Sequence, residues 1–175
     1  MRFRSLFVLA VSLSLASFSL HAKEIQTGAK VCSKPTSPCI TNAYAFQAHE
    51  LSFPLPAQLE WQSGHHSADF YAVILRSMKA IPVQDTHGEE VCKGFVAETE
   101  RLAIQAKFPE HKVFTSRNGC PSMVFYDNVN DKYNFIAVYA GENKTEAAAI
   151  VAKAKAAGFA DASLRKMQVI VDSGD

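Results

Sequence analysis

The residues best suited to chemistry are four cysteines and several histidines, and their spacing separates catalysis from structure. Cys92 or Cys120 with His87 or His111 could form a thiol nucleophile and its base. Cysteines of exported proteins are more often paired as disulfides, and the amino terminus described below predicts export. Zinc would need ligands at close spacing, yet the sequence has no Cys-x-x-Cys and no His-x3-His. We expect neither thiol catalysis nor a zinc site.

The remaining polar groups form no catalytic motif. His65 and His66 are adjacent, and adjacent side chains of an extended chain point apart, so we interpret them as solvated. Asp127, Asp131 and residues 128–130 resemble a cation loop, although a hairpin turn explains them equally well. The sequence has no glycine-rich phosphate loop and no serine nucleophile elbow. It therefore predicts a protein that is not an enzyme and holds no cofactor and no metal.

Composition and charge narrow the class of protein. Of the 175 residues, 48% are apolar and 20% are charged, and the formal net charge is +1. The apolar content excludes a disordered chain. The near-neutral charge argues against nucleic acid and anionic lipid as partners. A chain of this length buries roughly two-thirds of its surface, so one domain with an extension is expected.

The first 22 residues are typical of a signal peptide. They have a basic start, an apolar run from Leu6 to Leu20 broken by serines, and a small residue at Ala22. The run is too short and too rich in serine for a good membrane span. Cleavage after Ala22 removes two arginines and leaves 16 basic against 17 acidic residues, a net charge of −1. We expect a soluble periplasmic protein without membrane insertion.

All four cysteines follow this segment, and three pairings are possible. We favour Cys32–Cys39, which closes a short loop with two prolines. We also favour Cys92–Cys120, which joins the start of an expected helix to the end of an expected strand. No cysteine follows the signal directly, so a lipid anchor is not expected.

Beyond the signal, the chain divides into an extension over 23–66 and a regular domain over 67–172. Prolines and polar residues make the extension irregular. The domain shows periodic apolar patterns. We expect strands over 70–75, 112–115, 124–126, 133–140 and 164–171, and helices over 89–108 and 143–157.

Both helices carry finer signals. Asn143 is expected to cap the second helix in a capping box with Glu146, and Gly158 is expected to end it. The first helix is expected to bury one face, made of Phe95, Thr99, Leu102, Ala103 and Ala106.

This order predicts an α+β, ferredoxin-like βαββαβ fold: a four-stranded antiparallel sheet with two helices on one face, plus the irregular extension and one extra hairpin arm. An internal echo supports it, because residues 70–74 resemble residues 135–139.

The second half carries a family resemblance. Residues 133–141, the Ala- and Lys-rich stretch 145–157, then Gly158-Phe159 and Asp161-Ala162 resemble the SPOR (sporulation-related repeat) domain. The resemblance covers about residues 68–171. It implies a SPOR-like periplasmic protein whose sheet binds peptidoglycan glycan strands that lack stem peptides, in the cell envelope and at cell division sites. Where the family has a Gln and Arg residues, this chain has Val73 or Ile74, and Ile136 and Val138.

Continuous apolar strands usually have both faces covered. The strands over 71–75 and 135–140 show no clean polar alternation. We therefore expect the extension to cover the sheet face that lacks helices, through Phe53, Leu55, Leu59 and Trp61.

Polar side chains near the strand ends are the candidate ligand contacts, each of which could also be merely solvated: Arg76, Ser77, Arg117, Asn134, Arg165 and Gln168. Tyr133 and Tyr139 could stack on a sugar ring or belong to the core. Two functions stay open. One is a non-enzymatic module for peptidoglycan glycan strands. The other is an assembly factor that binds an envelope protein.

Overall fold

The apolar pattern is realised in eight strands and two helices within the residues that the computed structural model describes, namely 27–35, 39–40, 43–81, 95–118, 120 and 122–173. The predicted signal over 1–22 lies outside these residues. In chain order the elements are β1 (Thr27–Ala29), β2 (Gly64–Ser67), β3 (Phe70–Lys79), α1 (Glu98–Gln105), β4 (Val113–Thr115), β5 (Val124–Tyr126), β6 (Tyr133–Tyr139), α2 (Lys144–Ala156), β7 (Ser163–Met167) and β8 (Val169–Asp172).

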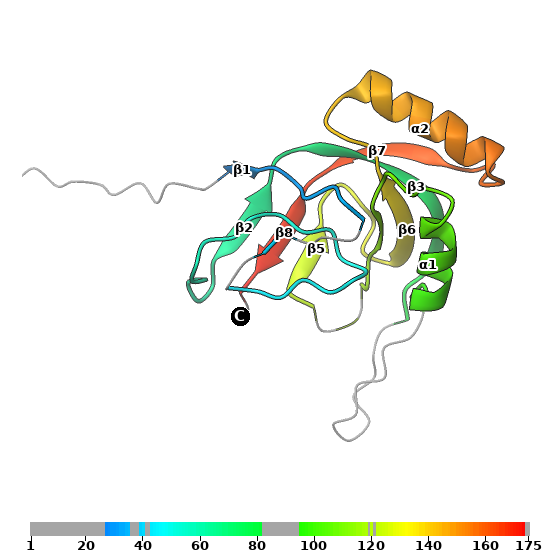
Figure 1. Ribbon diagram of the computed structural model, residues 1–175. Coiled ribbons are helices and arrows are strands. Elements are labelled where there is room, and N and C mark those ends of the chain that lie inside the picture. Colours follow the sequence, from blue (N-terminus) through cyan, green and yellow to red (C-terminus); the bar gives the residue numbers. More distant parts are fainter. Residues whose placement is uncertain are drawn as a thin grey trace, which may run out of the picture.

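The strands form two sheets, so the prediction of a single ferredoxin-like sheet is wrong (Figure 1). One sheet is antiparallel, with the strand order β4-β6-β3-β7. The other has the order β1-β2-β8-β5 and is mixed, because β1 and β2 run parallel. The predicted boundary between extension and domain falls within β2, so residues before it contribute strands to the mixed sheet.

The second sheet forms because the strand expected over 164–171 is divided into two strands, β7 and β8. Gln168 separates β7, which pairs with β3, from β8, which pairs with β2 and β5. The Gln168 N–H donates to the Asp127 carboxylate, and the Asp127 N–H donates to the Gln168 carbonyl at 3.3 Å. These bonds satisfy the backbone where the chain changes sheet. For the same reason β5 joins β8 and does not form the predicted hairpin with β6.

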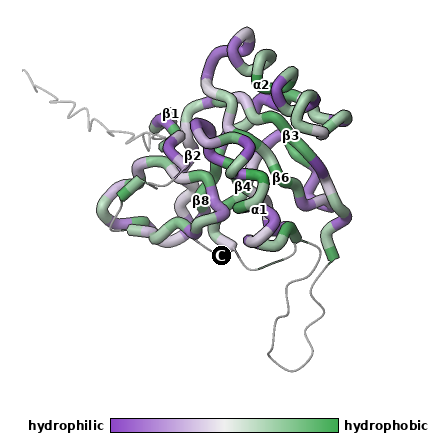
Figure 2. The backbone as a smooth tube through the Cα atoms, turned by 45° about the vertical axis from the view of Figure 1, so that its right-hand side comes forward, coloured by the Kyte–Doolittle hydropathy of each residue, from purple (hydrophilic) through white to green (hydrophobic). Residues whose placement is uncertain are grey.

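Two apolar clusters cover the two faces of the antiparallel sheet. Along β3, Phe70 and Ala72 belong to the cluster between the sheets, whereas Val73 and Leu75 belong to the cluster under the helices. β6 alternates in the same way. In Figure 2, most of β6 and the first part of β3 are coloured as apolar. The expectation that both faces are covered is confirmed.

Part of the extension, residues 43–59, covers the helix-free face, as expected, and we call it the covering segment. Phe53 is 1% exposed, and Leu55 and Leu59 pack against the same cluster. Leu51, which the sequence analysis did not select, is fully buried. Trp61 is 70% exposed, so its predicted packing is wrong. It lies in the turn before β2 and is not part of the cluster between the sheets.

The second helix follows its sequence signals and the first does not. Asn143 caps α2 by accepting from the Thr145 N–H at 2.8 Å, and Gly158 ends the helix with φ of +99°. The predicted apolar face of α1 is wrong, because Leu102 is 52% exposed. Arg101 and Ile104 are buried instead. The Arg101 guanidinium satisfies its donors inside, on the Glu98 carboxylate at 2.6 Å and the Val113 carbonyl at 2.9 Å.

A disulfide joins Cys32 and Cys39, as predicted. Its loop holds the covering segment, because the Cys32 N–H donates to the Ser52 carbonyl at 2.8 Å and the Cys39 N–H to the Ser52 hydroxyl at 2.9 Å. Cys120 is also disulfide-bonded, and its predicted partner Cys92 lies outside the described residues. Among the residues described, no helix has the length and apolar character needed to cross a membrane.

We expect the Phe53→Ala substitution to lower the free energy of unfolding by about 3–5 kcal/mol, because it leaves a cavity between the sheets. Trp61→Ala is the matched control and should change it by less than about 0.5 kcal/mol, since Trp61 is exposed. Urea denaturation followed by circular dichroism measures both. Equal effects of the two substitutions would contradict the covering role of Phe53.

Candidate functional site

A pocket of about 470 Å³ opens on the helix-free face of the antiparallel sheet. Strands β3, β6 and β7 form its floor, and the loop between β5 and β6 forms its wall. The lining residues are Ile74, Ser77, Asn128, Val129, Asn130, Tyr133, Phe135, Ser163 and Arg165.

The pocket lies next to the part of the antiparallel sheet that the mixed sheet covers, at the point where this cover ends. On β7, Met167 is opposite Phe70 of β3, and both side chains are buried between the sheets. Two residues earlier, Arg165 is opposite Ala72 and its side chain is exposed. Because alternate strand residues share a face, Met167 and Arg165 mark the covered and the open part of one face.

A β-bulge in β3 decides which polar side chain reaches the pocket. Ile74 pairs with Ala137 and Arg76 with Ile136, so Leu75 is the extra residue. Leu75 belongs to the cluster under the helices, and Arg76 forms an ion pair with Glu100 of α1 at 2.6 Å. The alternation then resumes, which places Ser77 on the same face as Ile74.

Backbone hydrogen bonds hold the loop between β5 and β6, which forms the wall of the pocket. The Tyr133 N–H donates to the Asn130 carbonyl at 3.0 Å, and the Ala80 N–H donates to the Lys132 carbonyl at 2.9 Å. Asn128 adopts a left-handed conformation with φ of +53°, which asparagine tolerates better than most residues. The loop is thus tied to β3 and β6 at its end, and through Asp127 to Gln168 at its start.

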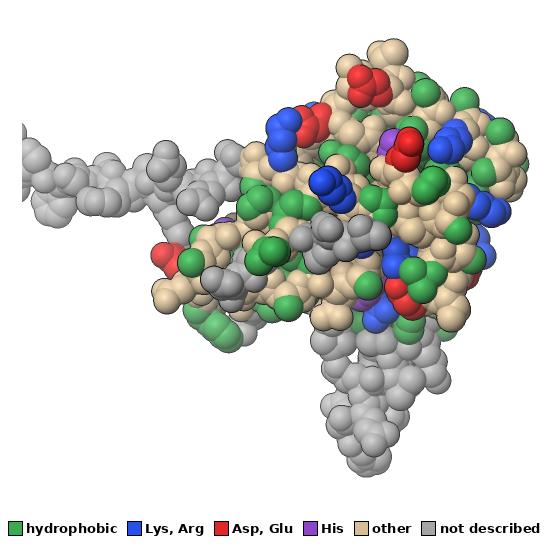
Figure 3. Space-filling view, viewed as in Figure 1, with side chains coloured by type: hydrophobic (Ala, Val, Ile, Leu, Met, Phe, Trp, Pro, Cys, Tyr) green, Lys and Arg blue, Asp and Glu red, His purple; other side chains and the backbone are tan. Residues whose placement is uncertain are grey.

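The pocket combines two aromatic residues, Tyr133 and the buried Phe135, with one positive charge and several neutral polar groups. Tyr133 is 46% exposed, so its ring is available on the surface. Arg165 is the one charged side chain among the described lining residues. Elsewhere charges are mixed: on the face seen in Figure 3, Lys and Arg side chains lie among Asp and Glu.

Two of the six predicted ligand residues, Ser77 and Arg165, line this pocket. Arg76 points to α1, as described above. The Arg117 guanidinium lies 4.6 Å from the centre of the Phe95 ring. Asn134 is fully buried and accepts a hydrogen bond from the Ser116 hydroxyl at 3.3 Å. Gln168 faces His66, with 3.4 Å between its side-chain oxygen and His66 Nδ1.

Sequence reasoning missed Ile74, Val129, Phe135, Ser163 and the asparagines as one site. The run 128–130 was visible as a polar turn, but its approach to β3 and β7 depends on two sheets that the sequence pattern did not reveal. Ser163, two residues before Arg165, was detectable from the period of two within a strand.

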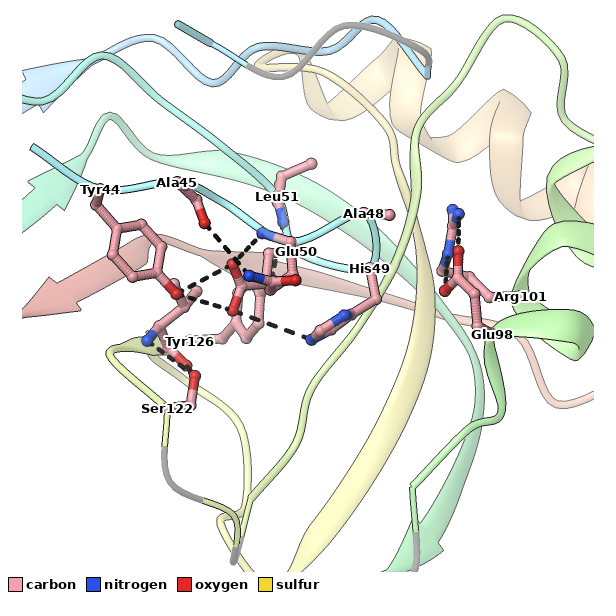
Figure 4. A network of polar contacts seen from close by, with 12 residues as sticks. Tyr44, Ala45, Ala48, His49, Glu50, Leu51, Glu98, Arg101, Ser122 and Tyr126 are labelled. Carbon is pink, nitrogen blue, oxygen red and sulfur yellow. Dashed lines mark hydrogen bonds and ion pairs between the residues drawn. The ribbon is translucent and has the colours of Figure 1, made fainter. Parts of the chain in front are cut away.

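A second cluster of polar groups lies along the first part of the covering segment (Figure 4). The Glu50 side chain is 5% exposed and accepts from the Gln47 N–H at 2.7 Å and from the Tyr44 hydroxyl at 3.3 Å. His49 lies beside it, with 4.0 Å between His49 Nε2 and Glu50 Oε1. The Lys112 ammonium donates to the Ala48 carbonyl at 2.6 Å. No local sequence signal indicates that these residues meet.

Burial dominates the electrostatics of this cluster. It lowers the pKa of His49 to about 4, helped by the positive charge of Arg117. It raises the pKa of Glu50 above its ordinary value, against the hydrogen bond from Gln47. It also lowers the pKa of Lys112 to about 8, with Arg101 adding repulsion. The Lys112 bond to the Ala48 carbonyl fastens this part of the chain to the residue before β4.

A smaller pocket of about 250 Å³ lies near the first turn of α2 and is lined by Ser33, Glu110, His111, Tyr139, Ala140, Gly141, Glu146 and Ile150. Across the described part of the chain, no group of three His, Cys, Asp or Glu side chains is placed to hold a metal ion. His65 Nε2 contacts the Ser63 hydroxyl at 3.1 Å.

Comparisons with protein-family models, curated proteins and solved structures find no match to this chain. The SPOR resemblance therefore stays a prediction.

We expect acid to weaken the fold partly through His49. Its native pKa near 4 lies below the ordinary 6.5, so only the unfolded chain takes up this proton as the pH falls between these values. The loss begins near pH 6.5 and is complete near pH 4, and it amounts to roughly 2 kcal/mol. Glu50 acts in the opposite direction, because its raised pKa lets the folded state bind a proton first.

The His49→Gln variant removes only the histidine contribution. Between pH 7 and pH 4.5 it should lose less unfolding free energy than the wild type, as measured by urea denaturation across this range. Parallel pH dependences of variant and wild type would show that His49 is not responsible.

Proposed function

We propose that this chain is a non-enzymatic binding module of the periplasm, and that its pocket accepts a segment of a peptidoglycan glycan strand. The observation that carries the proposal is the composition of the pocket. Sugar rings have apolar faces and hydroxyl edges, and the pocket offers the exposed Tyr133 ring together with Ser77 and Ser163 hydroxyls. Its volume, about 470 Å³, lies within the range of small-molecule sites, roughly 300–1,000 Å³.

The lining residues support binding without reaction. General acid–base or covalent catalysis needs a titratable group or nucleophile beside a base. The described lining holds hydroxyls, amides, apolar groups and one guanidinium, and no carboxylate, histidine or thiol. These groups orient a ligand by hydrogen bonds and contacts.

The Cys32–Cys39 disulfide supports the proposed location, because such bonds persist in oxidising compartments such as the periplasm. The proposed signal peptide over 1–22 would direct export there.

A second candidate is an assembly factor that binds an envelope protein. Phe125 favours it, because this side chain is 44% exposed on β5, the last strand of the mixed sheet. An edge strand offers unpaired backbone groups to an added strand, and an exposed ring beside it adds contact area. Phe125 and Tyr133 therefore separate the two candidates.

We expect the mature protein to co-sediment with purified peptidoglycan whose stem peptides were removed by an amidase. Tyr133→Ala should weaken this binding about tenfold, because the ring stacks on the sugar. Phe125→Ala is the matched control, since it removes a similarly exposed ring outside the pocket.

Absence of co-sedimentation, beside an active SPOR domain, would contradict glycan binding. Loss of binding in Phe125→Ala but not in Tyr133→Ala would place the glycan outside the pocket.

A further inference from the structure

Arg165 places a positive charge in the pocket, and no described residue opposes this charge. Three other basic side chains of the antiparallel sheet and α1 are paired: Arg76 with Glu100, Arg101 with Glu98, and Lys166 with Asp69. Lys79, at the end of β3, is exposed and does not line the pocket. Arg165 is adjacent to Lys166 in sequence and exposed, yet it forms no ion pair or hydrogen bond with any residue in the described part of the chain.

The loop between β5 and β6 contains two aspartates, but neither forms an ion pair with Arg165. Asp127 accepts hydrogen bonds from the Gln168 N–H and from the Asn128 side-chain amide, the latter at 3.1 Å. Asp131 is exposed and is not among the lining residues. The guanidinium of Arg165 is therefore the unopposed charge of a pocket whose other described polar groups are neutral.

A guanidinium binds best to a planar anion with two oxygens, because its donors form a fork that fits a carboxylate. The Ser77 and Ser163 hydroxyls line the same pocket and can donate to a carboxylate as well. A neutral sugar hydroxyl would use only part of these donors.

We infer that the pocket selects an acidic glycan, whose carboxylate binds Arg165 while a sugar ring contacts Tyr133. The inference rests on the proposed glycan binding and names the substrate class of the same pocket. Neutral glycans of equal length should bind more weakly, because they leave the guanidinium without an anion.

The test compares one glycan in two charge states. Peptidoglycan strands stripped of stem peptides carry free carboxylates, and carbodiimide coupling with ammonia converts these groups into neutral carboxamides of nearly the same size. The mature wild-type protein should bind the acidic form at least about tenfold more tightly, as measured by co-sedimentation at several protein concentrations. Added salt should weaken only the acidic form, since ionic screening acts on exposed charges.

Variants assign the preference to one residue. Arg165→Gln should reduce the preference to less than about twofold, whereas Arg76→Gln, which removes an equal charge on the helix side, should keep it. Circular dichroism melting checks that both variants fold.

Equal binding of the two glycan forms by the wild type would overturn the inference and leave the proposed glycan binding standing. A preference that survives in folded Arg165→Gln would also overturn it. Binding of neither form would overturn the proposed function, and the inference with it.

Discussion

Tyr126 is the contact on which the arrangement of the molecule depends. It lies on β5, and its ring centre is 5.2 Å from that of Phe114 and 5.5 Å from that of Phe135, so it joins the mixed sheet to the antiparallel sheet. Its hydroxyl accepts a hydrogen bond from the Leu51 N–H at 3.1 Å, so the same side chain also holds the covering segment in place. A buried tyrosine satisfies both demands because its ring is apolar and its tip is polar.

Covering the helix-free face turns most of it into core and leaves a pocket at one end. On β7, Met167 is buried whereas Arg165 is exposed, although they are two residues apart on the same face. If the mixed sheet covered the whole helix-free face, no pocket would remain there, and without the mixed sheet the face would be a broad groove. Because the cover is partial, a pocket remains between Ile74 and the loop at 128–130. Its shape depends on where the second sheet stops.

The resemblance to SPOR domains rests on residues 133–162, and this segment folds as its local signals predict. The β6 strand, the Asn143 cap and the Gly158 end all occupy their expected places. The surrounding architecture differs, because the mixed sheet covers the face on which the resemblance places glycan binding. Function is set by sites and not by local elements, and on this face the open site is the pocket at the end of the covered region.

The sequence by itself determined the elements governed by neighbouring residues: the continuous apolar strands, the capped helix α2 and the Cys32–Cys39 bridge, which needs only a short loop. The tertiary structure alone decided that the closing strand divides at Gln168 and that Arg101, not Leu102, is buried. It also decided that Ser77 and Arg165 share a pocket. The physical reason is that a buried charge, a bulge or a change of sheet is stabilised by partners distant in sequence, such as Asp127 for Gln168, which local periodicity does not encode.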